Sequence, residues 1–207
     1  MAFEDYWNKS FKQLQQSGQK VCYDNWLDKF VDLIKQTKSS ILDLGCGMGN
    51  DTLYLTERGF KVVSCDYSKE ALKSVKKLIP NSTTKIVDIS KKFPFGDEEF
   101  EVIIADLSLH YFDQKTTIEI MKEIKRILKK GGYLFARVNS TNDINFGAGK
   151  GEKIEENYYF VEGYNKRFFD IDDVNNYFSI IGKVEATEAV MTRFAKPKKL
   201  IEIKVEK

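Results

Sequence analysis

Histidine, cysteine and proline are all scarce in this sequence. The 207 residues include one histidine, three cysteines and three prolines. A single histidine argues against zinc sites and histidine triads, so we expect no metal ion. The three cysteines (Cys22, Cys46 and Cys65) are an odd number without metal-ligand spacing, which favours reduced thiols in a cytoplasmic protein.

The sequence also lacks a long apolar run, a signal peptide and an excess of either charge. No stretch of about 18 apolar residues occurs, so we expect no transmembrane helix and no membrane partner. Lysine and arginine number 33 against 31 aspartates and glutamates, a balance that does not favour nucleic acid as a partner. This length suffices for one domain with a sizeable core, and we expect a monomer or a homodimer.

Three alternating glycines behind an apolar strand form the most informative pattern in the chain. The predicted strand Ile41–Leu44 contains Asp43, and Gly45, Gly47 and Gly49 follow it. Glycine is needed where the backbone adopts a positive φ or where a side chain would collide with a ligand. The pattern therefore predicts a tight strand-to-helix turn that a ligand approaches closely.

Two classes of nucleotide cofactor use such a turn. A dinucleotide site has the pattern G-x-G-x-x-G, whose sixth position is Asn50 here, and it places a pyrophosphate where Asp43 would repel it. The segment instead resembles motif I of the class I S-adenosylmethionine-dependent methyltransferases, whose cofactor has a cationic amino group and no phosphate. The resemblance implies that S-adenosyl-L-methionine contacts Asp43, Gly45, Cys46 and Gly47.

Two further predicted strands end in an acid. Asp66 ends the strand 60–66, about 20 residues after the glycines, where both cofactor classes need a carboxylate for ribose hydroxyls. Ser68 is the better N-cap for the next helix, which leaves Asp66 for a ligand. The family resemblance implies that Tyr67 lies beside the adenine or ribose, and that Asp88 and Ile89 contact the adenine.

The residues after the fourth strand are the candidates for catalysis. A sulfonium methyl group is already activated, so a thiol or amine acceptor needs no strong base, whereas a hydroxyl acceptor needs one. His110 and Asp106 are the candidate bases. His110 alternatively serves packing, and Asp106 alternatively faces the sulfonium or the amino-acid end of the cofactor, or caps the next helix.

The order of the predicted elements gives the fold class. We predict an α/β, Rossmann-like, doubly wound sheet of seven strands, mostly parallel with an antiparallel C-terminal strand. The expected strands are 41–44, 60–66, 85–89, 100–105, 133–138, 183–194 and 198–205. The expected helices are 3–16, 22–38, 68–79, 116–130 and 170–178, with Gly131-Gly132 ending the fourth of them.

Two segments outside the alternating elements are assigned to substrate binding within this single domain, 1–207. Residues 1–38 are expected to form a helical lid, or alternatively to dock on the sheet edge, and residues 139–169 a substrate-cap insertion. The candidate contacts to a small-molecule acceptor are Tyr6, Trp7, Arg137, Tyr158, Tyr159 and Arg167. Their aromatic rings would enclose the acceptor, and an arginine would pair with an acidic group on it.

The class of acceptor is inferred from missing motifs. Nucleic-acid amino methyltransferases usually carry an Asn/Asp/Ser-Pro-Pro-aromatic run where this chain has Asp106-Leu107-Ser108-Leu109, and no cysteine here follows a proline. Within the family the chain resembles the small-molecule type, including tellurite-resistance-like members. Two other functions stay open: a nicotinamide-dependent oxidoreductase, and a catalytically idle cofactor-binding module that regulates a partner.

Overall fold

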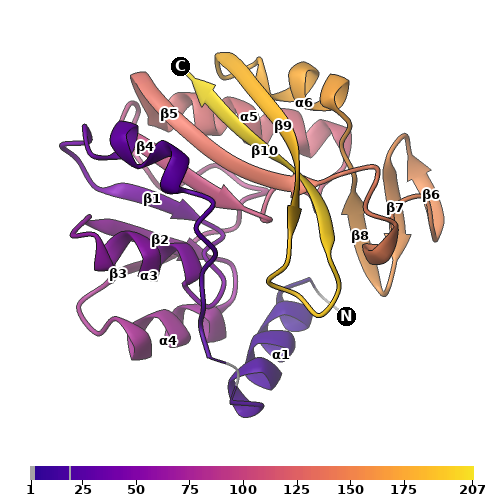
Figure 1. The fold of residues 1–207 in the computed structure, drawn as a ribbon, viewed down its shortest axis with the longest axis horizontal. Helices are drawn as coiled ribbons and strands as arrows, with labels where there is room; N and C mark the ends of the chain where they lie inside the picture. The colour runs from indigo at the N-terminus through magenta and orange to yellow at the C-terminus, as the bar shows by residue number, and fades with distance from the viewer. Residues whose placement is uncertain (1–2, 19) are drawn as a thin grey trace.

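The computed structural model describes residues 3–18 and 20–207, and a seven-stranded sheet lies at its centre (Figure 1). The strand order is β3-β2-β1-β4-β5-β10-β9. The strands from β3 to β5 are parallel, whereas β10 is antiparallel to both β5 and β9. The bounds are β1 Ile41–Leu44, β2 Val62–Asp66, β3 Thr83–Ile86, β4 Phe100–Asp106, β5 Leu128–Asn139, β9 Lys183–Met191 and β10 Lys198–Glu206. This topology confirms the predicted fold class.

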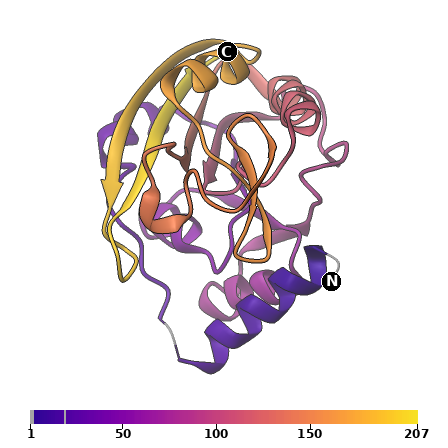
Figure 2. The same cartoon turned by 90° about the vertical axis from the view of Figure 1, so that its right-hand side faces the viewer.

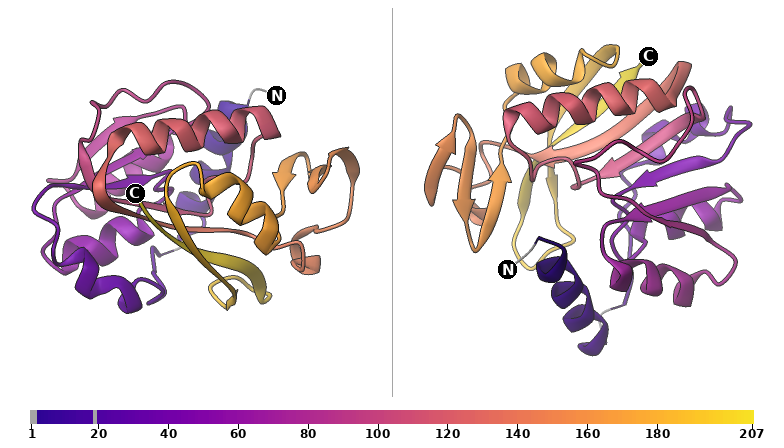
Figure 3. Two further views of the ribbon diagram at one scale, coloured as in Figure 1. Left: turned by 90° about the horizontal axis from the view of Figure 1, so that it is seen from above. Right: turned by 180° about the vertical axis from the view of Figure 1, so that it is seen from behind.

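Helices cover both faces of the sheet, as a parallel sheet requires. On one face, α5 (Gln114–Ile127) and α6 (Ile171–Phe178) lie side by side and bury Met121, Ile124 and Phe178 against the strands (Figure 3). On the other face, α3 (Asn50–Glu57) packs through Tyr54, together with Trp26. The short elements η1 (Asp28–Phe30) and α2 (Val31–Ile34) join this second layer, and α4 (Lys69–Leu78) packs against β2 and β3.

Two additions lie beyond the carboxyl ends of the strands. The first is a three-stranded antiparallel sheet of β6 (Glu152–Glu155), β7 (Tyr158–Val161) and β8 (Tyr164–Arg167), preceded by η2 (Ile144–Phe146) (Figure 2). The second is α1 (Phe3–Gln16), which lies outside the sheet and packs along α4. Both therefore lie where ligands of open α/β sheets bind.

Local signals in the sequence predicted several of the observed boundaries. The predicted first helix, 3–16, coincides with α1. Ser68 caps α4 by accepting a hydrogen bond from the Ala71 backbone N–H at 3.2 Å, as its N-cap chemistry predicted. The last two strands form the expected antiparallel hairpin. Short-range chemistry was sufficient at these positions.

Four expected elements differ in the structure. Residues 22–38 form only η1 and α2, because Trp26 and Leu27 enter the core from a segment that is otherwise irregular. The third strand occupies 83–86 rather than 85–89. The helix before β5 ends at Ile127, so Gly131 and Gly132 lie inside β5 instead of ending a helix. Residues 139–169, for which no strand was predicted, contain η2 and the β6–β8 sheet.

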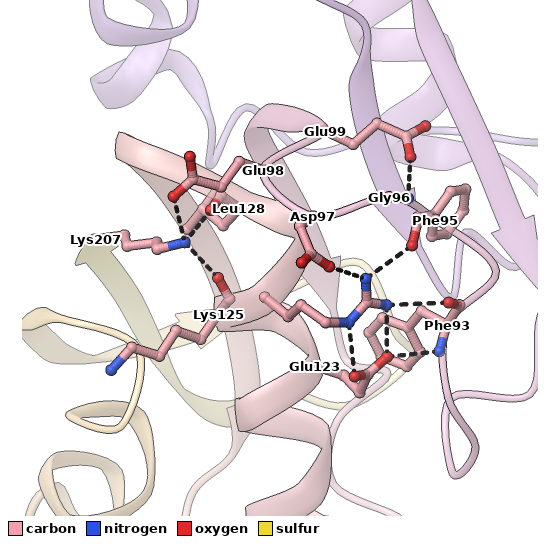
Figure 4. A network of polar contacts seen from close by, with 11 residues as sticks. Phe93, Phe95, Gly96, Asp97, Glu98, Glu99, Glu123, Lys125, Leu128 and Lys207 are labelled. Atoms are coloured by element: carbon pink, nitrogen blue, oxygen red, sulfur yellow. Dashed lines mark hydrogen bonds and ion pairs between the residues drawn. The ribbon is translucent and has the colours of Figure 1, made fainter.

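The loop from β3 to β4 is fixed to the last turn of α5, directly before β5 begins. The guanidinium of Arg126 donates to the backbone oxygens of Phe93 and Phe95 at 3.1 and 2.9 Å, and it pairs with Asp97 and Glu123. Figure 4 shows these partners together. Because the same loop begins with Asp88 and Ile89, this anchoring limits the positions that those two residues can adopt.

Candidate functional site

A cavity of about 520 Å³ opens at the carboxyl ends of the central strands. Its volume lies in the range of about 300–1,000 Å³ that is typical of small-molecule sites. The lining side chains come from the loops after β1 to β5, from α1, from the β8 region and from the β9–β10 hairpin. This is the edge where open α/β sheets bind their ligands.

The glycine turn after β1 lines one end of this cavity, and its glycines serve two different purposes. Gly45 has φ +79°, and a Cβ added to it would lie 2.3 Å from Cβ of Ser108. Glycine is therefore required there by the approach of the loop after β4. Gly47 has φ +52°, and an added Cβ would meet only the Phe11 ring at 3.5 Å, so this position keeps the cavity wall open.

Asp66, at the end of β2, lines the cavity and holds the glycine turn. One carboxylate oxygen accepts from the Gly47 N–H at 2.9 Å, and the other accepts from the Ser68 N–H at 2.8 Å. Burial raises the pKa of this carboxyl, and the backbone N–H groups oppose that increase. Each oxygen keeps acceptor capacity for a ligand hydroxyl, because a carboxylate oxygen has two lone pairs.

Two further acids, Asp43 and Asp51, line the cavity together with the glycine turn. Asp43 is 1% exposed and accepts from the Thr52 hydroxyl at 2.6 Å. Burial, with added repulsion from Asp106 and Asp66, raises the pKa of Asp43 to about 7. Burial also raises the pKa of Asp51, which accepts from the Trp26 indole at 3.0 Å. Buried carboxyls that crowd one another favour a cationic ligand, because a positive charge relieves their repulsion.

The remaining predicted cofactor residues also line the cavity. They are Cys46, Tyr67, Asp88 and Ile89. One oxygen of Asp88 accepts from the backbone N–H and the hydroxyl of Ser90, at 2.9 and 2.6 Å. Burial raises the pKa of the Cys46 thiol well above its usual range, so this cysteine contributes a wall rather than a nucleophile.

His110 lines the other half of the cavity. It is 3% exposed, and its Nδ1 has no hydrogen-bond partner among the described residues. Burial lowers the pKa of His110 well below its usual range, and the charges of Lys198 and Lys166 lower it further. The imidazole is therefore neutral at physiological pH. Its backbone oxygen accepts from the Arg167 N–H at 2.7 Å, which fixes the loop to β8.

Asp106 lines the cavity but is engaged by two arginines. Its oxygens accept from Arg137 Nε and Nη2 at 2.7 and 2.8 Å, and from Arg193 Nη2 at 2.9 Å. Burial alone would raise its pKa, yet the two guanidinium groups lower it below the usual value. Asp106 is thus an ionised ion-pair partner and a weak base.

Five of the predicted acceptor contacts do not line the cavity. Arg137 is 1% exposed and pairs with Asp24 as well as with Asp106. Tyr158 donates to the Tyr111 backbone oxygen at 3.2 Å, and Arg167 donates to the Phe112 backbone oxygen at 3.1 Å. These contacts attach the small sheet to residues 110–112. Tyr6 and Tyr159 also lie outside the lining set.

The structure adds lining residues that the sequence reasoning missed. Phe11 and Leu14 of α1 line the cavity beside Trp7, which was predicted, and the spacing of four and three residues is the signal of a single helix face. The others come from separate parts of the chain and share no local pattern: Asp51, Ser108, Asn139, Phe146, Tyr164, Lys166, Arg193, Phe194 and Lys198.

The residues at the glycine end fit S-adenosylmethionine. A buried carboxylate at the end of β2 suits ribose hydroxyls, and the crowded acids suit a cationic sulfonium and ammonium. Within residues 3–18 and 20–207, no three histidine, cysteine or acidic side chains are grouped to hold a metal ion. None of the helices described has the length and apolar character needed to cross a bilayer.

Comparison with curated proteins agrees with this fit. Residues 42–136 match the family described as "Methyltransferase domain". An uncharacterized methyltransferase of Synechocystis is 35% identical over 99 residues, covering 48% of this chain and 46% of that protein. A probable S-adenosyl-L-methionine-dependent methyltransferase of Haemophilus influenzae, TehB, is 27% identical over 146 residues, covering 68% of this chain and 47% of that protein.

Other relatives differ in the acceptor that they are named for. A tRNA N(3)-cytidine methyltransferase of Danio rerio is 30% identical over 156 residues, covering 69% of this chain and 44% of that protein. The chain spans about half the length of the curated relatives that it matches. No acceptor therefore follows from these similarities alone.

A solved structure extends the likeness to the whole fold. A SAM-dependent methyltransferase from Methanosarcina mazei superposes with a TM-score of 0.69 at 19% identity, covering 86% of this chain and 96% of that one. The matched domain, the strand order and the acid-lined glycine turn agree with one another. Residues 42–136 thus match a methyltransferase domain, within the fold of the class I S-adenosylmethionine-dependent methyltransferases.

Proposed function

We propose that this protein transfers the methyl group of S-adenosylmethionine to a small-molecule acceptor by direct displacement. The proposal is supported by one observation: the glycine turn, Asp43, Asp66, Asp88 and the loop after β4 all line the same cavity. The cofactor supplies a methyl group on a positively charged sulfur, which retains the electron pair of the broken bond. We further propose that the protein acts in the cytoplasm.

The chain's own residues would divide the remaining work. Asp66 would accept hydrogen bonds from ribose hydroxyls, and Asp43 would bind the cationic amino end. His110, neutral and with Nδ1 unpartnered among the described residues, would accept the proton of a hydroxyl acceptor. Asp106 is less suited to that role, because hydrogen bonds from Arg137 and Arg193 already occupy its oxygens.

The cavity is covered on two sides, which favours a small acceptor over a macromolecule. Trp7, Phe11 and Leu14 of α1 cover one side, and residues after β5 cover another. Tyr6 lies 5.0 Å from Tyr164 between ring centroids, so the two coverings meet. We infer that residues 1–38 and 139–169 act as the lid and the substrate cap of one domain.

The activity is tested with methyl-labelled S-adenosylmethionine and a cell extract separated into small molecules, RNA and protein. We expect label only in the small-molecule fraction. Label confined to RNA or protein would overturn the small-molecule acceptor, and cofactor binding without label anywhere would favour an idle regulatory module. Calorimetry with S-adenosylhomocysteine and with NADH distinguishes the oxidoreductase alternative, since we expect only the former to bind.

Replacing Asp66 by alanine should weaken S-adenosylhomocysteine binding by about 1–3 kcal/mol, the value of charge-assisted hydrogen bonds to a ligand. Calorimetry on the folded variant measures this change. Asp172→Ala removes an equal charge from the exposed first turn of α6 and should leave affinity unaltered. Equal affinities for Asp66→Ala and the parent protein would remove Asp66 from the cofactor site.

Binding of S-adenosylhomocysteine should slow amide exchange in α1 by about tenfold, because a ligand at the glycine turn would contact Phe11 and stabilise the covered state. Hydrogen–deuterium exchange with mass spectrometry resolves this helix from α5, whose buried face should exchange at the same rate in both states. Identical rates in α1 with and without ligand would mean that this helix is a fixed part of the fold.

A further inference from the structure

Three cationic side chains line the half of the cavity that the cofactor residues do not occupy. They are Lys166 of β8, Arg193 of the β9–β10 hairpin and Lys198 of β10. Their side chains are 6%, 15% and 7% exposed, respectively. Burying a cation is unfavourable unless an anion or a hydrogen bond compensates it. The acids Asp43, Asp51, Asp66 and Asp88 line the cofactor end, and Asp106, which repels Asp43 and pairs with Arg193 at 2.9 Å, stands where this acidic end meets the basic one.

The protein carboxylates that pair with the two lysines lie outside the cavity lining. Lys198 Nζ is 2.8 Å from Asp143, and Lys166 pairs with Glu162, whose side chain is 57% exposed. Neither acid lines the cavity, whereas both lysines do. Each lysine thus has a counterion outside the cavity lining, and its positive charge still acts on the cavity, because it lowers the pKa of His110.

Unpartnered polar atoms are concentrated at this basic end. Four buried side-chain atoms in the described part of the chain lack a hydrogen-bond partner, and three of them belong to lining residues: His110 Nδ1, Asn139 Oδ1 and Arg193 Nη1. His110 and Asn139 are 3% and 1% exposed. Buried polar groups are almost always satisfied in native proteins, so such a concentration indicates a missing polar ligand.

Aromatic rings complete the basic end. Lys166 Nζ lies 4.7 Å from the centre of the Tyr164 ring, and Lys198 Nζ lies 4.4 Å from that of Phe146. Phe146 and Phe194 are 5.6 Å apart between ring centroids, and all three rings line the cavity. A ligand in contact with these rings needs an apolar body as well as a charge.

We propose that the methyl acceptor is a small organic anion with an apolar body, and that Lys166, Arg193 and Lys198 bind its carboxylate. The proposal rests on the proposed function and specifies the substrate class. It makes the two halves of the cavity complementary to the two ligands: acids bind the cationic cofactor, and cations bind the anionic acceptor. The amide of Asn139 and the neutral imidazole of His110 supply uncharged hydrogen-bonding groups between them.

The chain contains a single histidine, which makes His110 a specific NMR reporter for this end of the cavity. The experiment uses tag-free protein, with and without saturating S-adenosylhomocysteine. It follows the His110 imidazole signals as benzoate, phenylacetate or 3-phenylpropanoate is added, each paired with its neutral amide. Inorganic phosphate forms a separate arm, because it carries the charge without the apolar body.

We expect at least one carboxylate to move the His110 signals at concentrations below about 10 mM and to bind about tenfold more tightly than its amide. Lys166→Met should weaken that carboxylate about tenfold and leave S-adenosylhomocysteine affinity unchanged. Lys153→Met is the matched control, because Lys153 also belongs to the small sheet and pairs with an exposed glutamate, yet it lies outside the cavity lining.

A second variant tests the more deeply buried pair, Lys198 and Asp143. Lys198→Met alone would leave the Asp143 carboxylate uncompensated, so it is combined with Asp143→Asn, and the double variant should also lose carboxylate binding about tenfold. The proposal is overturned if amides bind as well as carboxylates, if no carboxylate binds, or if phosphate alone binds. Failure of S-adenosylhomocysteine to bind would instead overturn the proposed function. The two failures are distinguishable, because the carboxylate titration is also performed in the absence of S-adenosylhomocysteine.

Discussion

Replacing Gly45 by alanine is expected to abolish measurable cofactor binding and to lower the free energy of unfolding by about 3 kcal/mol. The estimate combines about 1–2 kcal/mol for a non-glycine residue at positive φ with about 1–3 kcal/mol for overpacking. The new Cβ would lie 2.3 Å from Cβ of Ser108, whose hydroxyl donates to the Leu44 backbone oxygen at 2.6 Å. Ser108 is therefore fixed, and the glycine turn itself must move.

Gly59 supplies the matched control for this substitution. Its φ is +83°, close to the +79° of Gly45, and nothing lies within 4 Å of an added Cβ. Gly59→Ala should therefore cost about 1 kcal/mol of stability and leave binding intact. Urea unfolding and calorimetry with S-adenosylhomocysteine measure both variants. Equal losses of stability for the two alanines would show that the approach of Ser108 does not constrain the turn.

Replacing Asp43 by asparagine is expected to have opposite effects on stability and on binding. The pKa of Asp43 is raised to about 7 by burial and by Asp106 and Asp66, so the folded state binds its proton more tightly than the unfolded state does. The parent protein therefore loses stability at this site as the pH rises from about 4 to about 7. Asparagine carries no charge and avoids that loss.

We expect Asp43→Asn to stabilise the ligand-free protein by about 1–3 kcal/mol more at pH 8 than at pH 5, and to weaken S-adenosylhomocysteine binding at pH 8 at least about tenfold. Thr52, which donates to Asp43 at 2.6 Å, finds an acceptor in the asparagine oxygen. Urea titrations at both pH values provide the measurement. A stability difference that does not change with pH would mean that Asp43 titrates normally.

The cofactor half of the site was predictable because its signals are local. Asp43, Asp66 and Asp88 each lie in the last two residues of a predicted strand, and parallel strands bring their carboxyl ends to one edge. The glycine turn carries its own conformational signature. The structure places all of these residues around one cavity.

The acceptor half was not predictable, because tertiary contacts assemble it. Asn139, Lys166 and Lys198 lie far apart in the chain and reach the same cavity only through the hairpin and the small sheet. Arg137 seemed suited to an anionic group, but a buried guanidinium pairs with the nearest acids, and Asp24 and Asp106 already bind it.

The errors in secondary structure have the same origin. Residues 22–38 carry helix-like apolar spacing, but Trp26 and Leu27 gain more by entering the core beside Tyr54 than by extending a helix. A Cβ on Gly132 would lie 2.7 Å from the Glu101 backbone oxygen, so this glycine permits strand pairing where a helix cap was expected. Neither contact can be predicted from the local sequence, because each depends on residues that are distant in the chain.

The position of α1 has a consequence for how the two ligands affect each other. On the cofactor side, Asn8 accepts from the Ser68 hydroxyl at 2.7 Å and Gln15 donates to the Ser74 hydroxyl at 2.7 Å. On the acceptor side, Trp7 lies 5.2 Å from Tyr111 between ring centroids. One helix thus contacts both α4 and the loop after β4, and whichever ligand binds first would bear the entropy loss of ordering it. The second ligand then binds to an ordered helix, which gives positive cooperativity of equal size in either order of addition.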